Sequence, residues 1–321
     1  MILLFLDEYE KIIERARHAG KKRFLIAWNR GFGDVPLCVY GFVALIKDRL
    51  RDAEVTIMTR PGLDEVFRLI KIVDDVITIP HWTRDDNLKR GQPGKLDVEE
   101  ELERLNLMGR FDVLIPNLRA GKWRTRQIGR IIPRLEWREE YRKLDCFANA
   151  HNDKDREDKY VVSLHPDSET GYIYGYNKNW DMDNWRELVK RLLSNYKDIH
   201  FILLGLKKQD EPFLSHPSII DMRGRTDIRQ LLSIVTSSNM LIAPDSGILT
   251  LVYYLDVNLP LDVISLWGPA KYGVLQLKVA SPNRLLTHFP LKGKKDDINN
   301  IRVEDVLRIV KERMTLWGLK C

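Results

Sequence analysis

Cysteine is scarce in this sequence. Cys38, Cys146 and Cys321 are the three cysteines among 321 residues, and they lie far apart in the chain. They form no C-x-x-C pair and no spacing typical of a structural zinc site. The sequence therefore supports neither a disulfide framework nor a zinc centre, and we expect a protein of the reducing cytosol.

Long apolar runs are also missing. No stretch approaches the ~20 apolar residues that cross a bilayer as a helix. Residues 1–6 are apolar, but Asp7, Glu8 and Glu10 follow at once, with no small-residue cleavage site. These features predict neither an integral membrane protein nor a secreted one.

The charge excess of one sign is small: 52 basic and 46 acidic residues give a net charge of +6. This balance does not predict nucleic-acid binding, which usually requires a concentrated basic face. One segment differs, because six basic residues and no acid lie between positions 119 and 134. They are Arg119, Lys122, Arg124, Arg126, Arg130 and Arg134. This run is either a solvated helix face or a site for an anionic glycan or lipid surface.

Apolar runs alternate with amphipathic segments through both halves of the chain, which indicates β-α-β units and parallel sheets. The predicted strands cover residues 24–28, 54–58, 76–79, 113–116, 160–164, 200–204, 240–243 and 263–266. The predicted helices cover residues 36–50, 63–71, 184–195, 227–237, 248–255 and 303–317. Residues 151–159 contain no apolar side chain and are the best linker candidate. We therefore expect an α/β protein of two doubly wound domains, residues 1–150 and 160–302, facing a cleft. The closing segment, 303–321, is a candidate to pack back on the N-terminal domain.

The first site candidate is Arg30-Gly-Phe-Gly-Asp34, between a strand and a helix. Its glycines permit a tight turn and close approach to a ligand. Pro36 replaces the third glycine of a dinucleotide fingerprint, so that motif is not met. Asp34 either caps the helix or acts as a general base on an acceptor hydroxyl.

The second domain has three further candidates at predicted strand ends, where doubly wound sheets bind ligands. His165 opens a polar loop that leads to Lys178, which is either solvent-exposed or a phosphate contact. Asp245-Ser246-Gly247 lies between a strand and a helix, as an ordinary cap or as an anion site. Gly268 and Pro269 line the same predicted edge. The absence of a G-x-S-x-G elbow argues against a serine hydrolase. Asp181-Met-Asp183 resembles a D-x-D metal motif but opens a helix, so no metal is assigned.

Taken in order, these motifs resemble glycosyltransferase family 9, the heptosyltransferases of lipopolysaccharide biosynthesis, from about residue 24 to residue 317. The matching segments are Gly33-Asp34, His165, Lys178-Asn-Trp180, Trp185-Arg-Glu-Leu188, Leu203-Leu-Gly205, Gly224-Arg-Thr226, Asp245-Ser-Gly-Ile-Leu-Thr250 and Trp267-Gly-Pro269. Thr250 stands where the family has a histidine.

The resemblance implies a GT-B fold, with a nucleotide-diphosphate sugar, of the ADP-linked type, held by the C-terminal domain. Asp34 would be the catalytic base of a metal-independent, inverting sugar transfer, with no cofactor. The donor would contact His165, Lys178, Asp245, Ser246, Gly247, Thr250, Gly268 and Pro269. An anionic bacterial glycan or glycolipid acceptor would contact Gly33, Arg119, Lys122, Arg124 and Arg126.

The acceptor class further implies a cytoplasmic location with peripheral contact at the inner membrane. Two alternatives stay open: an epimerase or hydrolase of the same fold, and a non-catalytic nucleotide-sugar-binding protein. Asp34 favours catalysis, because a binding protein needs no base.

Overall fold

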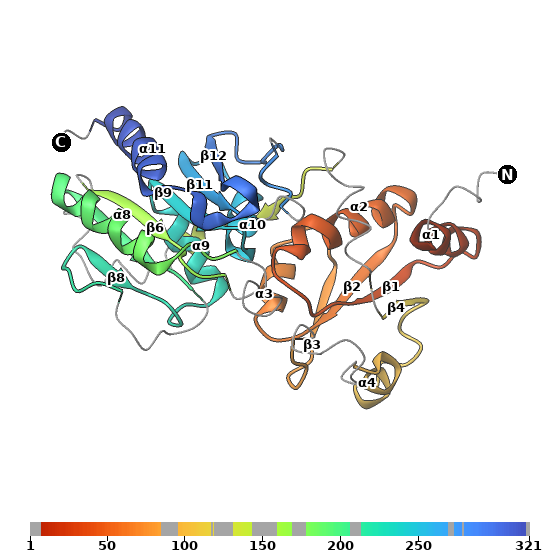
Figure 1. Cartoon of the computed structure of the whole chain (residues 1–321). Coiled ribbons are helices and arrows are strands. Elements are labelled where there is room, and N and C mark those ends of the chain that lie inside the picture. The colour runs from red at the N-terminus through yellow and green to blue at the C-terminus, as the bar shows by residue number, and fades with distance from the viewer. Residues whose placement is uncertain are drawn as a thin grey trace. The chain divides into compact units, whose positions relative to one another are not determined.

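A computed structural model describes residues 8–84, 96–116, 118, 131–142, 159–168, 178–205, 213–268, 273–277 and 279–318. The chain divides into two compact units, with the boundary between Glu136 and Trp137. Each unit contains a parallel sheet covered by helices (Figure 1).

The first unit is built on a four-stranded parallel sheet in the order β3-β2-β1-β4. The strands are β1 (Arg23–Ala27), β2 (Glu54–Thr59), β3 (Asp75–Thr78) and β4 (Val113–Ile115). Residues 24–27 of β1 are all buried, as expected of a central strand covered on both faces. The carboxyl ends of all four strands therefore meet at one edge of this sheet.

The helices of the first unit are α1 (Glu8–His18), the π-helical turn η2 (Val35–Val39), α2 (Tyr40–Arg49), α3 (Leu63–Phe67) and α4 (Val98–Arg104). A two-residue strand, β5 (Leu135–Glu136), closes the unit. α1 packs on α2, where the rings of Tyr9 and Phe42 meet edge to face with centroids 5.5 Å apart. On one face of the sheet, Val98 and Leu102 of α4 pack against Leu25 of β1.

The second unit has a six-stranded parallel sheet in the order β12-β11-β9-β6-β7-β8. Its strands are β6 (Tyr160–Leu164), β7 (Ile199–Leu203), β8 (Ile219–Asp221), β9 (Met240–Pro244), β11 (Leu261–Trp267) and β12 (Leu286–Lys292). β12 was not expected from the sequence. It contains Pro290, which a sheet tolerates at an edge strand.

The helices of this unit are α6 (Glu139–Arg142), α8 (Met182–Asn195), α9 (Ile228–Thr236), α10 (Gly247–Tyr253) and α11 (Val303–Leu316). The short elements β10 (Leu255–Asp256), η5 (Lys294–Asp296) and η6 (Ile298–Asn300) complete it. One face of the sheet is covered by α8 and α11, whose buried residues share one core with Val162 and Ile264.

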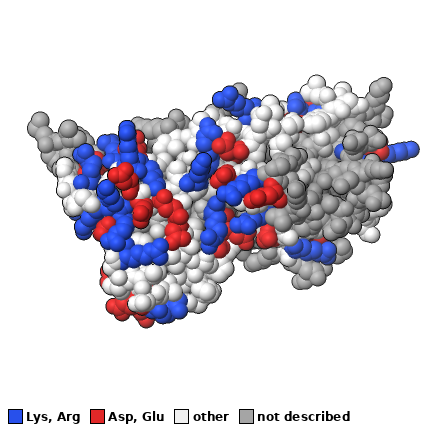
Figure 2. Space-filling view, turned by 180° about the vertical axis from the view of Figure 1, so that it is seen from behind, with Lys and Arg blue, Asp and Glu red and all other residues white. Residues whose placement is uncertain are grey.

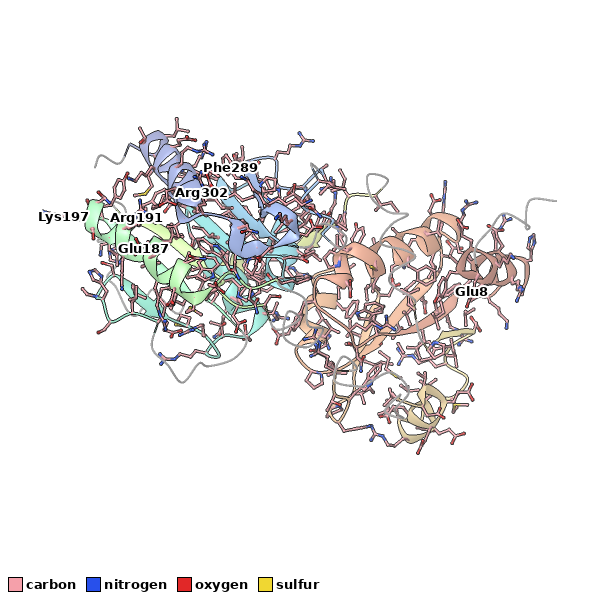
Figure 3. The ribbon with its side chains drawn as sticks, viewed as in Figure 1. Glu8, Glu187, Arg191, Lys197, Phe289 and Arg302 are labelled. Carbon is pink, nitrogen blue, oxygen red and sulfur yellow. The ribbon has the colours of Figure 1, made fainter. Side chains whose placement is uncertain are left out.

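Helix α11 packs within the second unit, and its predicted packing on the N-terminal domain stays a prediction. Val306 and Val310 are fully buried in the core that α8 also lines. An ion pair of 2.8 Å joins Arg191 of α8, labelled with its helix neighbour Glu187 in Figure 3, to Glu304 of α11. The apolar face of the helix is therefore used in its own unit.

The unit boundary also precedes the predicted linker. The rings of Trp137 and Tyr141 pack at a tilt with centroids 5.1 Å apart, and the guanidinium of Arg229 in α9 lies over the Tyr141 ring. These contacts attach residues 137–142 to the second unit. Residues 151–158 of the predicted linker, 151–159, lie outside the described residues, so the linker itself stays a prediction.

The described surface carries charges of both signs. Figure 2 shows Lys and Arg mixed with Asp and Glu on the face it presents, without one large patch of a single sign. No helix among the described residues is both long and apolar enough to cross a membrane. Within the same residues, no group of three or more His, Cys, Asp or Glu side chains could hold a metal ion.

Candidate active site

The carboxyl edge of the first sheet is drawn together by contacts between the ends of three strands. The hydroxyl of Thr59, the last residue of β2, donates to the Trp28 carbonyl at 2.5 Å. The Asn29 amide donates to the Thr83 carbonyl at 2.7 Å, which connects the end of β1 to the segment beyond β3. These hydrogen bonds hold Trp28 and Asn29 in place, directly before the segment that carries Asp34.

Asp34 lies in a tight turn directly before η2. Its N–H donates to the Gly31 carbonyl at 3.2 Å, and the next N–H, of Val35, donates to the Phe32 carbonyl at 3.1 Å. Asp34 occupies the capping position, yet its carboxylate makes no capping hydrogen bond. The capping alternative therefore does not explain this residue. Instead, Oδ2 lies 3.8 Å from the point where a Cβ on Gly31 would stand.

Three arginines surround this turn. Nη2 of Arg84 lies 3.7 Å from the same point beside Gly31. The guanidinium of Arg60 lies 5.4 Å over the Phe32 ring, and that of Arg30 lies 5.8 Å over the Trp28 ring. Arg60 is held further by its own hydrogen bonds, because Nε donates to the Asn29 carbonyl at 3.4 Å and Nη1 to the Pro61 carbonyl at 3.2 Å. Arg30 belongs to the motif found in the sequence, whereas Arg60 and Arg84 could not be found there, because they follow other strands of the sheet.

At the edge of the second sheet, Lys178 forms an ion pair with Asp245. The two side chains are only 15% and 22% exposed. Lys178 precedes α8, and Asp245 follows β9, so the pair connects residues 67 positions apart in the chain. The structure thus brings the sequence-predicted residues Lys178 and Asp245 together, and the ammonium of Lys178 is not simply solvent-exposed.

Neighbouring residues hold this pair in place. Asn179 accepts the Ser168 N–H at 2.8 Å through its side-chain oxygen, and the Ser168 hydroxyl donates to the Asp245 carbonyl at 3.2 Å. Trp180 is buried and donates its indole N–H to the Ile301 carbonyl at 3.0 Å. The segment around Lys178 is therefore anchored on both sides.

Ser246 and Thr250 have definite local roles. Ser246 is the N-cap of α10, and its hydroxyl accepts the Leu249 N–H at 3.2 Å. The Thr250 hydroxyl donates to the Ser246 carbonyl at 3.0 Å, inside the helix. Both residues are buried, and Gly247 begins the helix between them. Thr250 therefore stabilises the turn, and a donor contact by its hydroxyl stays a prediction.

His165 connects two strand ends. Its Nδ1 lies 3.1 Å from the carbonyl oxygen of Leu204, and its backbone N–H donates to Ile242. A carbonyl oxygen only accepts, so Nδ1 carries the hydrogen and Nε2 is an acceptor. Burial lowers the pKa of His165 to about 4, so the ring is neutral near pH 7. A neutral acceptor nitrogen does not suit a phosphate oxygen, and donor contact by His165 also stays a prediction.

Gly268 is buried directly after β11, beside the end of β9. The remaining predicted residues, Pro269, Arg119, Lys122, Arg124 and Arg126, lie outside the described residues. Beyond Gly205 the structure adds Arg223, which is 3% exposed and pairs with Asp221 at 2.6 Å. The sequence analysis missed this pair because β8, which leads into it, is only three residues long.

Solved structures of other proteins have the same fold over most of this chain. The chain superposes on a glycosyltransferase family 9 protein from Veillonella parvula with a TM-score of 0.59 and 12% identity, covering 92% of this chain and 97% of that one. It matches the ADP-heptose LPS heptosyltransferase II of E. coli with a TM-score of 0.59 and 13% identity, over 93% and 100% of the two chains. This is the GT-B glycosyltransferase fold.

A third GT-B structure, the E. coli heptosyltransferase WaaC with ADP, matches with a TM-score of 0.53 and 13% identity, over 91% and 99% of the chains. No protein-family model matches the sequence. No curated protein sequence matches it either. The resemblance drawn from the motifs is thus confirmed at the level of the GT-B fold.

Proposed function

We propose that this chain is an inverting glycosyltransferase that moves a heptose-like sugar from a nucleotide-diphosphate sugar to an anionic glycan or glycolipid acceptor. The observation that carries the proposal is the Lys178–Asp245 pair, held at the carboxyl edge of the second sheet beside Ser246 and Gly247. Two structures of the same fold were solved with ADP and with an ADP-heptose analogue. They support an ADP-linked donor.

In the proposed reaction, the Asp34 carboxylate accepts the proton of an acceptor hydroxyl. The hydroxyl oxygen then forms a bond to the anomeric carbon of the donor, while the bond from that carbon to the diphosphate oxygen breaks. The electron pair of this bond leaves with the nucleoside diphosphate. Lys178 and the N–H groups of Gly247 and Ile248 offset the charge that develops on the leaving group. We assign no step to a metal, since these groups supply the positive charge.

The acceptor is proposed to bind at the first unit, around Asp34. Arg30, Arg60 and Arg84 place three guanidinium groups around the Gly31–Asp34 turn. Guanidinium groups bind phosphate and carboxylate through paired hydrogen bonds, which suits an acidic inner-core sugar or glycolipid. A glycolipid acceptor would bring the protein to the cytoplasmic face of the inner membrane. The basic run at 119–134 remains a further acceptor-binding prediction.

The test is a transfer assay with a panel of ADP-, UDP- and GDP-sugars and a phosphorylated glycolipid acceptor, comparing the wild type with Asp34→Asn. Asn keeps the size of the side chain but is not a base, and loss of a general base typically lowers the rate ~10²–10⁴-fold. Donor affinity should be unchanged. A folded Asp34→Asn variant with the wild-type rate would contradict the assignment of the base. Donor binding without transfer or hydrolysis by the wild type would favour the non-catalytic alternative.

A further inference from the structure

Two buried side chains and one half-buried histidine form a hydrogen-bonded chain across β11 and β12. The Trp267 indole N–H donates to the Ser265 hydroxyl oxygen at 2.6 Å. That oxygen lies 2.6 Å from Nε2 of His288, one residue before Phe289, which is labelled in Figure 3. Ser265 is fully buried, and Trp267 is 1% exposed. Nothing in the proposed reaction so far uses these residues.

The Ser265 oxygen can serve both partners at once. An indole N–H only donates, so it occupies one lone pair of the Ser265 oxygen. The second lone pair and the hydroxyl hydrogen of Ser265 serve Nε2 of His288, which accepts in one neutral tautomer of the ring and donates in the other. Burial lowers the pKa of His288 to about 4, so the ring is neutral near pH 7. In either tautomer, the Ser265 oxygen joins the Trp267 indole to the His288 ring.

This chain ends beside the proposed donor loop. Leu266 is the register partner of Pro244, so Trp267 and Gly268 lie next to Asp245 at the same sheet edge. The backbone of Trp267 is fixed as well, because its carbonyl accepts the Gly293 N–H at 2.9 Å. A Cβ atom at position 273 would overlap the Trp267 ring, so the backbone at Gly273 packs directly against this ring.

The other end of the chain contacts the helix that begins at the donor loop. The ring of Tyr253, in α10, packs edge to face on the His288 ring with centroids 5.1 Å apart. The Tyr253 hydroxyl donates to the Val279 carbonyl at 2.7 Å. His288 is therefore packed against α10 and hydrogen-bonded through Ser265 to the end of β11.

We propose that His288, acting through Ser265, is a positioning residue that fixes the Trp267-Gly268 segment against the donor diphosphate loop. The inference rests on the proposed function, since it assigns these residues to the donor site. Loss of the hydrogen bond to Nε2 leaves the Ser265 hydroxyl free to rotate and weakens its bond with the indole. The Trp267 ring, and with it the edge of the donor site, then loses its fixed orientation.

The test combines exchange at the Trp267 indole N–H with calorimetric ADP binding. His288→Leu removes the hydrogen-bonding group, whereas His288→Gln keeps one, because the side-chain amide can accept from or donate to the Ser265 hydroxyl. We expect His288→Leu to speed indole exchange and weaken ADP binding about fivefold each, the factor of one neutral hydrogen bond. His288→Gln should stay near the wild type. In a Trp267→Phe background, which lacks the N–H, His288→Leu should weaken ADP binding no further.

Ser163→Ala provides the matched control. Ser163 is a fully buried serine of β6 whose hydroxyl is 2.8 Å from that of Ser238, away from Trp267. It should destabilise the fold to a similar degree while leaving indole exchange and ADP affinity unchanged. Unaltered indole exchange in His288→Leu would overturn the inference even if the wild type binds ADP. So would an equal loss of ADP affinity in the Trp267→Phe background. A wild type that shows the expected indole protection yet binds no ADP would instead overturn the proposed donor site.

Discussion

Lys178→Ala provides a demanding perturbation of the proposed donor site. The ammonium of Lys178 pairs with Asp245, and both side chains are largely shielded from solvent. Replacement by alanine removes the positive charge and leaves the Asp245 carboxylate without this partner. The variant therefore changes the site from a neutral pair to a net negative charge, next to the segment proposed to bind a diphosphate.

The size of the effect follows from these charges. A hydrogen bond to a charged group contributes about 1.5–3 kcal/mol, so the loss of Lys178 should raise the Kd for ADP ~10–150-fold. Two unit charges 4 Å apart repel by about 1 kcal/mol even in water. Removing the carboxylate as well, in Lys178→Ala/Asp245→Ala, should therefore recover at least ~5-fold of the lost affinity.

Calorimetry with ADP and with adenosine measures this directly. Adenosine lacks phosphates, so its affinity should change little in either variant. Lys190→Ala, an exposed lysine on the same helix α8, is the control and should bind ADP like the wild type. Equal losses for ADP and adenosine, or no loss for either in Lys178→Ala, would refute the placement of the diphosphate.

Three further predictions follow from other parts of the molecule. Arg84→Ala should raise the acceptor KM ~10-fold or more, as expected from the loss of a charge-assisted hydrogen bond, and leave the donor KM unchanged in the same assay; equal changes in both would place this arginine elsewhere. Burial lowers the pKa values of His165 and His288 to about 4, below the ordinary value of 6.5. Between pH 6.5 and 4 the unfolded chain therefore binds more protons than the folded one, and stability falls as pH is lowered, by up to ~1.4 kcal/mol per pH unit for each histidine. In urea unfolding, His288→Gln should flatten this slope, and an unchanged slope would show that the histidine does not contribute. Arg313→Met removes the partner of Asp262, which is 3% exposed and accepts from Nε of Arg313 at 2.9 Å. Unfolding should then require about 3 kcal/mol less free energy, the lower end of the range for breaking a buried pair, and a loss below about 1 kcal/mol would contradict the pair's role in anchoring α11.

The sequence predicted the elements whose side chains follow a clear period. The buried runs that became β1, β6 and β9 lie within one or two residues of their expected bounds, because central parallel strands are continuously apolar. The edge strand β12 was not predicted. β12 includes His288 and Pro290, and residues of these types do not predict a strand. Proline is tolerated here because β12 is an edge strand of the sheet.

The candidate site was predictable where a motif carries it and not where the fold assembles it. Asp34 was found from its glycine turn, but only the structure shows that its carboxylate does not cap the helix. Lys178 and Asp245 were found separately, while their pairing depends on two loops meeting across the sheet edge. Arg60 and Arg84 come from different strand ends, so no local pattern brings them together.

The central claim, inverting transfer from a nucleotide-diphosphate sugar, is tested most directly by the configuration of the product. The wild-type protein, an ADP-sugar of known anomeric configuration and a phosphorylated glycolipid acceptor would be incubated together, and the product examined by ¹H NMR. The account predicts a new glycosidic bond of the opposite anomeric configuration, with one ADP released for each sugar transferred. Retention of configuration, free sugar alone, or an epimerised nucleotide sugar would contradict it.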